Sequence, residues 1–192
     1  LLDQSYYQLL RLVNNLSAAA VYLNSDKPLP LQDRDMVDTV RELCAQAEAP
    51  ALLGLELRFV CSRSQYICAF HQPSLELLVQ HLLSNAFKFT PAGGTVTVEL
   101  KFHAKRVLLT VADTGCGIPP QELARITEPF YMVDKSVHGS RAAAAWGLPV
   151  RQNAALHGTT LQFASVPSQG TTVSFCLQKA GSQPEVEHEG KE

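Results

Sequence analysis

The strongest constraint on the fold is a pair of segments in which apolar and polar residues alternate. In TVTVELKFHAKRVLLTVAD, apolar residues occupy every second position on both sides of the polar turn HAKR. They are Val96, Val98, Leu100 and Phe102 before the turn, and Val107, Leu109 and Val111 after it. This alternation gives each strand one apolar face and predicts an antiparallel hairpin. The segment TTLQFASVPSQGTTVSFCLQ predicts a second hairpin, whose turn is PSQG.

Helical segments come before these hairpins. Asp33 or Asp35 can cap a helix whose apolar residues are Met36, Val37, Val40, Leu43 and Cys44, and which ends before APALLG. A longer helix, SLELLVQHLLSNAFKF, has an apolar stripe of Leu75, Leu78, Val79, Leu82, Leu83 and Ala86. Helices alternating with hairpins predict an antiparallel sheet with helices packed on one face.

The two ends of the chain differ from this central part. Apolar residues at alternating spacings of four and three form a heptad seam: Leu2, Tyr6, Leu9, Val13, Leu16, Ala20 and Leu23. The seam suits a coiled coil or helical bundle, or a single helix packed on its own domain. The final stretch, AGSQPEVEHEGKE, is polar and acidic without an apolar period, which predicts a disordered tail.

Composition narrows the classes of partner. A chain of 192 residues with 46% hydrophobic residues can form one sizeable core. Its net charge of -2, without a Lys/Arg cluster, argues against nucleic acid as a partner. No apolar run is long enough to insert directly into a membrane. The five cysteines are odd in number and never at CxxC spacing, so we expect small buried hydrophobes in a reduced, cytosolic compartment.

Two sets of polar residues are candidates for a site. His81, Asn85 and Lys88 lie within one narrow arc of the long helix, where they can converge on a ligand or form a plain solvated face. Asp113 ends an apolar strand in VADTGCGIPP, and the following glycines allow a ligand close to the backbone. Its carboxylate can accept a hydrogen bond from an amino group. Aspartic proteases also use D-T-G, but this chain has one copy and would have to act as a symmetric dimer.

Five segments together carry a more specific resemblance. HLLSNAFKFTPAGG, VADTGCGIP, EPFYMVDKS, GLPVRQNAALHG and SVPSQGTTVSF follow one another in this order. They resemble the catalytic ATP-binding domain of bacterial sensor histidine kinases, from the superfamily shared with gyrase and the Hsp90 chaperones. The resemblance implies an α+β fold, a two-layer α/β sandwich with a mixed, largely antiparallel sheet covered on one face by helices and preceded by a helical segment.

The resemblance also implies a division of the chain and a set of partners. Residues 1–48 would hold part of the dimerisation hairpin, residues 49–178 the ATP-binding domain and residues 179–192 the tail. None of the six histidines has the H-E-[LI]-[RK]-x-P context of a phosphoacceptor, so we expect that histidine before Leu1. Because the chain begins without Met, we expect a cytoplasmic segment of a longer, membrane-anchored sensor that forms homodimers and phosphorylates a response regulator.

Site roles carried over from the family concern ATP and Mg²⁺. Asn85 would bind the Mg²⁺ ion, Lys88 a phosphate, and Asp113 the adenine amino group. His81 replaces the usual Asn, and either holds a water molecule or is a tolerated polar residue. The remaining ATP-binding residues implied are Phe89, Gly115, Gly117, Ile118, Phe130, Tyr131, Lys135, Gly147 and Leu148. Core packing is an alternative role for Phe130 and Tyr131.

One segment departs from the family. Related kinases have a G-x-G-L-G-L run, whereas this chain has AAAAWGLPV. Alanine keeps the backbone N–H that binds phosphate but loses the conformational freedom of glycine. The sequence therefore predicts either an active kinase with a weakened phosphate loop, or a nucleotide-binding-deficient scaffold that dimerises and relays a signal.

Overall fold

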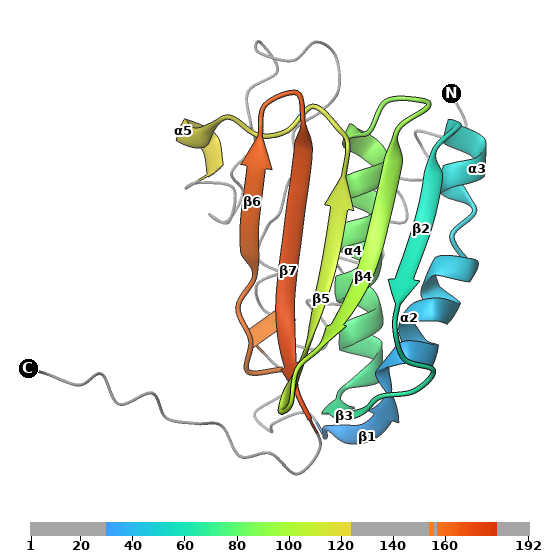
Figure 1. Ribbon diagram of the computed structural model, residues 1–192, viewed down its shortest axis with the longest axis vertical. Helices are drawn as coiled ribbons and strands as arrows, with labels where there is room; N and C mark the ends of the chain where they lie inside the picture. Colours follow the sequence, from blue (N-terminus) through green and yellow to red (C-terminus); the bar gives the residue numbers. More distant parts are fainter. Residues whose placement is uncertain (1–29, 124–153, 156, 180–192) are drawn as a thin grey trace, which may run out of the picture.

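The computed structural model describes residues 30–123, 154–155 and 157–179. Its main feature is a five-stranded sheet in the order β2-β4-β5-β7-β6 (Figure 1). The strands are β2 (Glu56–Cys61), β4 (Thr95–Phe102), β5 (Arg106–Asp113), β6 (Gln162–Val166) and β7 (Gly170–Gln178). β2 and β4 are parallel, and the other pairs are antiparallel. The predicted mixed, largely antiparallel sheet is confirmed.

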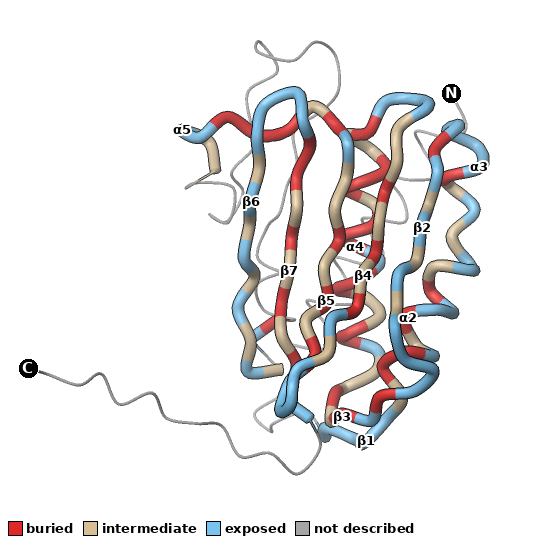
Figure 2. Tube along the Cα trace, in the orientation of Figure 1, coloured by how far each residue is buried: buried red, intermediate tan, exposed pale blue. Residues whose placement is uncertain are grey.

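Both predicted hairpins are present. In the first, Val96 lies opposite Asp113 and Phe102 opposite Val107, so HAKR is the turn. In the second, Val166 lies opposite Gly170. Alternate residues of β4, β5 and β7 are buried, as the period of two predicts, and Figure 2 shows this alternation along the strands.

Helices cover one face of the sheet. α4 (Gln72–Phe89) lies behind β4 and β5, and α2 (Met36–Ala45) lies beside it on the β2 side (Figure 1). The apolar stripe of α4 packs into the same core as the buried residues of the strands. Two short helices, α3 (Ala49–Leu53) and α5 (Pro120–Leu123), are also present. These layers form the predicted two-layer sandwich.

The region before residue 48 also contains a strand that the sequence analysis missed. β1 (Gln32–Asp35) pairs antiparallel with β3 (Ile67–Phe70) in a separate two-stranded sheet. Asp33 therefore lies within a strand, opposite Ala69, and Asp35 caps α2. Met36, Val37 and Val40 of α2 are fully buried in the common core. The hydrophobic core thus crosses the domain boundary predicted at residue 48.

The predictions on the chain ends and the cysteines can be compared with the structure only where residues are described. The heptad seam and residues 180–192 of the predicted tail lie outside the described residues. All five cysteines are free thiols, and burial raises the pKa of Cys44 to about 11 and of Cys68 to about 12. In the part of the chain that the structure describes, no helix combines the length and apolar character that crossing a bilayer requires.

Asp35 generates a prediction about stability. Its Oδ1 accepts hydrogen bonds from the backbone N of Val37 at 2.9 Å and of Tyr66 at 3.1 Å, so it joins the start of α2 to β3. We expect Asp35→Ala to lower the free energy of unfolding by about 1–2 kcal/mol, because both donors lose their acceptor. Chemical denaturation measures this value. Asp38→Ala is the control, since Asp38 pairs with Arg41 on the exposed surface and its loss should cost under about 1 kcal/mol; equal costs would contradict the prediction.

Candidate functional site

Asp113 is the last residue of β5, and its carboxylate is fixed by two backbone donors. Oδ1 accepts from the N–H of Gly115 at 2.8 Å and from the N–H of Thr171 at 3.2 Å. One donor lies in the loop after β5 and the other at the start of β7. Both of these bonds use Oδ1, so neither occupies Oδ2, which can accept a hydrogen bond from a ligand.

Burial raises the pKa of Asp113, while the hydrogen bonds from Gly115 and Thr171 act in the opposite direction. A carboxyl whose pKa is raised in the folded state destabilises the fold when ionised, and this cost falls as the pH drops and the group protonates. The protein therefore maintains a half-buried charged acceptor at a cost in stability. Such a group is typical of a binding site.

The loop after Asp113 is held on both sides by close backbone contacts. A Cβ on Gly115 would overlap the carbonyl oxygen of Phe89, and it would lie 2.7 Å from Oδ1 of Asp113. Gly117 has a φ of 67°, and a Cβ there would overlap the carbonyl oxygen of Val166. These two glycines let the loop pass between the end of α4 and the β6–β7 turn.

The polar arc of α4 is not a solvated face. His81 is 8% exposed and Asn85 is 3% exposed, whereas Lys88 is partly buried. Nδ2 of Asn85 is buried and has no hydrogen-bond partner within the described part of the chain. Because a half-turn of the amide would present Oδ1 instead, this position can offer a donor to a phosphate oxygen or an oxygen to a cation. A buried amide with unused hydrogen-bonding capacity is expected where a ligand binds.

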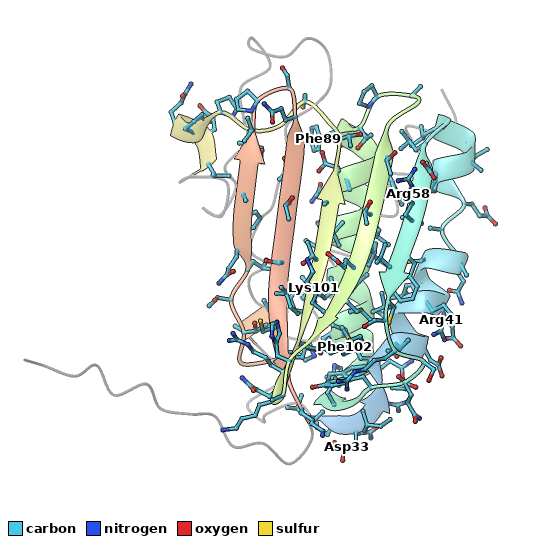
Figure 3. The ribbon with its side chains drawn as sticks, in the orientation of Figure 1. Asp33, Arg41, Arg58, Phe89, Lys101 and Phe102 are labelled. Carbon is cyan, nitrogen blue, oxygen red and sulfur yellow. The ribbon has the colours of Figure 1, made fainter. Side chains whose placement is uncertain are left out.

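Phe89 links this arc to the Asp113 loop. Its ring lies 5.0 Å from the Lys88 ammonium, and its carbonyl oxygen accepts a hydrogen bond from Cys116 N at 3.3 Å. Figure 3 shows Phe89 at the end of the sheet where β5 ends, far from Phe102 at the opposite end. The C-terminal end of α4 and the Asp113 loop therefore lie side by side.

Ile118 is hydrogen-bonded to Ser165, which in turn contacts Thr171, and the sequence analysis missed both hydroxyl residues. Ile118 is 8% exposed, and its backbone N donates to Oγ of Ser165 at 2.8 Å. Ser165 lies opposite Thr171 in the sheet, and their hydroxyl oxygens are 2.9 Å apart. Thr171 is buried and Ser165 is half-buried, and each lies on the same face of its strand as a core-packed residue, Val173 or Phe163. A hydroxyl residue at such a position was the available signal.

The remaining predicted site residues, Phe130, Tyr131, Lys135, Gly147 and Leu148, lie outside the described residues. The alanine run does as well. The structure thus places Phe89, with Lys88 against its ring, beside Gly115 of the loop. Asn85 lies one turn earlier on α4, and the same loop carries Gly117 and Ile118 after Asp113.

Residues 71–181 match the family model described as histidine kinase-, DNA gyrase B-, and HSP90-like ATPase. Among curated proteins, the chain is similar to the histidine protein kinase DivJ of Caulobacter vibrioides, with 36% identity over 124 residues that cover 65% of this chain and 21% of DivJ. The chain covers between 18% and 32% of the length of these curated relatives.

Solved structures show the same similarity. Full-length ShkA in complex with AMPPNP superposes with a TM-score of 0.74 and 26% identity, covering 93% of this chain and 38% of ShkA. The histidine kinase ThkA in complex with the response regulator protein TrrA superposes with a TM-score of 0.69, covering 90% of this chain and 48% of that one. At 16% identity, the second comparison shows the fold alone.

The contact between the loop and α4 can be tested at Gly115. We expect Gly115→Ala to lower the free energy of unfolding by about 1–3 kcal/mol, because the new methyl group would push the loop away from the Phe89 carbonyl. Amide hydrogen exchange at Cys116 should accelerate in parallel. Gly93→Ala is the matched control: it has a φ of 82° but no atom within 4 Å of a new Cβ, so it reports only backbone strain. Unchanged exchange at Cys116 would argue against the contact.

Proposed function

The chain belongs to the histidine kinase-, DNA gyrase B- and HSP90-like ATPase family, and on this premise we propose that it binds Mg-ATP and transfers the γ-phosphoryl group to a histidine on a dimerisation helix. Membership argues against the aspartic-protease alternative. The observation that carries the proposal is the Asp113 carboxylate, which two backbone donors hold by one oxygen. The other oxygen would accept from the amino group of adenine, with Phe89 and Ile118 as its apolar surroundings.

The residues present fit Mg²⁺ bound jointly with the nucleotide. Asn85 has a buried amide with an unused position, and Mg²⁺ commonly takes one or two protein oxygens together with phosphate oxygens and water. When bound, the ion would supply charge neutralisation at the phosphates. Lys88, one turn further along α4, would add a positive charge near the same groups.

Positioning would account for most of the catalysis. In phosphoryl transfer the protein chiefly orients the reacting groups and stabilises charge, and here the nucleophile would come from another domain. His81 is buried on the arc of Asn85, one turn away, where a neutral imidazole could hold a water molecule. This role belongs to the proposal, and a tolerated polar residue is its alternative.

The partners are also proposed. The chain covers at most 32% of these curated relatives, so the phosphoacceptor helix and the sensory parts would lie in other segments of a longer protein. A response regulator would be the final acceptor of the phosphoryl group, as the similarity to sensor histidine kinases suggests. Homodimerisation would use the heptad seam in residues 1–23, and the segment would lie in the cytoplasm.

A second candidate function follows from AAAAWGLPV, which replaces the glycine-rich run of related kinases. Losing one or two charge-assisted hydrogen bonds to phosphate, at about 1.5–3 kcal/mol each, would weaken binding by roughly ten- to several-thousand-fold. The chain would then be a scaffold that dimerises and relays a signal while binding nucleotide poorly.

Calorimetric titration with a non-hydrolysable ATP analogue separates the two functions. An active kinase should bind at micromolar concentration in a Mg²⁺-dependent manner, and Asn85→Ala should remove most of that dependence because the amide no longer reaches the ion. Gln80→Ala, on the exposed side of α4, is the control. A folded protein that binds no nucleotide up to millimolar concentration would be the scaffold.

Asp113→Asn tests the adenine contact. The amide oxygen can still accept from Gly115 and Thr171, but the side chain would now direct an NH₂ donor at the adenine amino group. We expect affinity to fall by about ten- to a hundredfold while the thermal midpoint stays unchanged or rises, because the buried charge is removed. In the wild type, affinity should fall as the pH drops and Asp113 protonates, and the variant should lack this dependence. Equal affinities at neutral pH would contradict the assignment.

A further inference from the structure

Ser165 of β6 is the centre of a hydrogen-bond cluster beside Asp113. Its Oγ lies 2.8 Å from the backbone N of Ile118, 2.9 Å from the carbonyl oxygen of Gly170 and 2.9 Å from Oγ1 of Thr171. Ile118 belongs to the Asp113 loop, whereas Gly170 and Thr171 are the first two residues of β7. One hydroxyl group therefore connects β6, β7 and the loop.

The chemistry of the partners fixes the direction of each hydrogen bond. A serine hydroxyl donates one hydrogen bond and accepts two. Ile118 N–H can only donate and the Gly170 carbonyl can only accept, so the Ser165 proton goes to Gly170. The contact with Thr171 is then made only if Thr171 donates its proton to Ser165. The Ser165 hydroxyl then makes all three of its possible hydrogen bonds. Because Thr171 has donated its only hydroxyl proton, its Oγ1 can act only as an acceptor toward another group.

The same cluster closes a ring through the carboxylate. Thr171 N–H donates to Oδ1 of Asp113, and so does Gly115 N–H. From Gly115 the chain leads to Ile118, whose N–H returns to Ser165. The ring thus runs from Asp113 through the loop to Ser165, on to Thr171 and back to Asp113.

The backbone of Gly170, the first residue after the β6–β7 turn, also contacts the backbone of Asp113. Gly170 has a φ of 106°, and a Cβ at this residue would overlap the backbone carbonyl oxygen of Asp113. The turn therefore lies directly against the residue whose carboxylate the ring holds. A change at Ser165 is transmitted to Asp113 through Thr171 and through this contact.

We propose that Ser165 is a positioning residue for base recognition, an inference that rests on the nucleotide-binding function proposed above. It holds Asp113 by Oδ1, which leaves Oδ2 for a ligand, and it restricts the Thr171 hydroxyl to accepting. These two groups then offer acceptors, which favour a base carrying an exocyclic amino group. A base with a carbonyl at the same position would place an acceptor against an acceptor and lose affinity.

The test compares ADP with IDP, which differ only at the base. Dissociation constants of both are measured by calorimetry for the whole 192-residue chain and its variants. In the wild type we expect ADP to bind at least about tenfold more tightly than IDP, and in Ser165→Ala we expect this preference to fall by about tenfold, as the loss of one positioned hydrogen bond implies. Ser165→Thr keeps the hydroxyl and should restore the preference. Ser174→Ala, a serine on the other face of β7, should leave it unchanged.

The ratio of the two constants separates positioning from a merely structural role, because general loosening of the fold weakens both nucleotides alike. If Ser165→Ala does not fold, Thr171→Val decides: it removes only the hydroxyl and keeps the backbone N–H that binds Asp113. A preserved ADP preference in Ser165→Ala, or in Thr171→Val where the first does not fold, overturns the role of Ser165 and leaves the nucleotide-binding function standing. A folded wild type that binds neither nucleotide overturns that function, and the inference with it.

Discussion

Packing of α4 against the sheet is the interaction on which the rest of the structure depends. Leu75, Leu78, Val79 and Leu82 are fully buried in the core that the strands share. Full burial of each such side chain contributes about 1.5–3 kcal/mol, whereas a typical hydrogen bond contributes about 0.5–1.5 kcal/mol net. Apolar packing therefore sets where the C-terminal end of α4 lies. The hydrogen bonds around Asp113 then refine the geometry of a loop that this packing has already brought to Phe89.

The site shows where the protein departs from the most stable arrangement. Asp113 is a half-buried carboxylate whose pKa is raised by burial, and Asn85 is a buried amide with an unused hydrogen-bonding position among the described residues. The charge of the first and the unused position of the second both oppose folding. They lie on β5 and α4. A ligand with an amino group and phosphates would satisfy both under the proposed function.

The sequence predicted the elements whose pattern is local. The hairpins follow from the period-two alternation around a polar turn, and α4 follows from one continuous apolar stripe. The pairing of β1 with β3 was missed, because each strand has four residues and Gln32 and its partner Phe70 are far apart in the chain. Asp113 was a candidate site residue because it ends an apolar strand and is followed by two glycines, Gly115 and Gly117. Ser165 was missed because its role depends on the register that places it opposite Thr171.

On the proposed function, the alanine run would act on a different part of the site from Asp113. The base-binding end would consist of Asp113, the loop up to Ile118, Ser165 and Thr171, which hydrogen bonds among the described residues hold together. The phosphate-binding end would instead combine the arc of α4 with backbone N–H groups of the run. Replacing glycines there would act first on phosphate binding, because alanine keeps the N–H but loses conformational freedom. Base recognition and phosphate binding would then be built from separate parts, so a chain could lose phosphoryl transfer and still select its nucleotide.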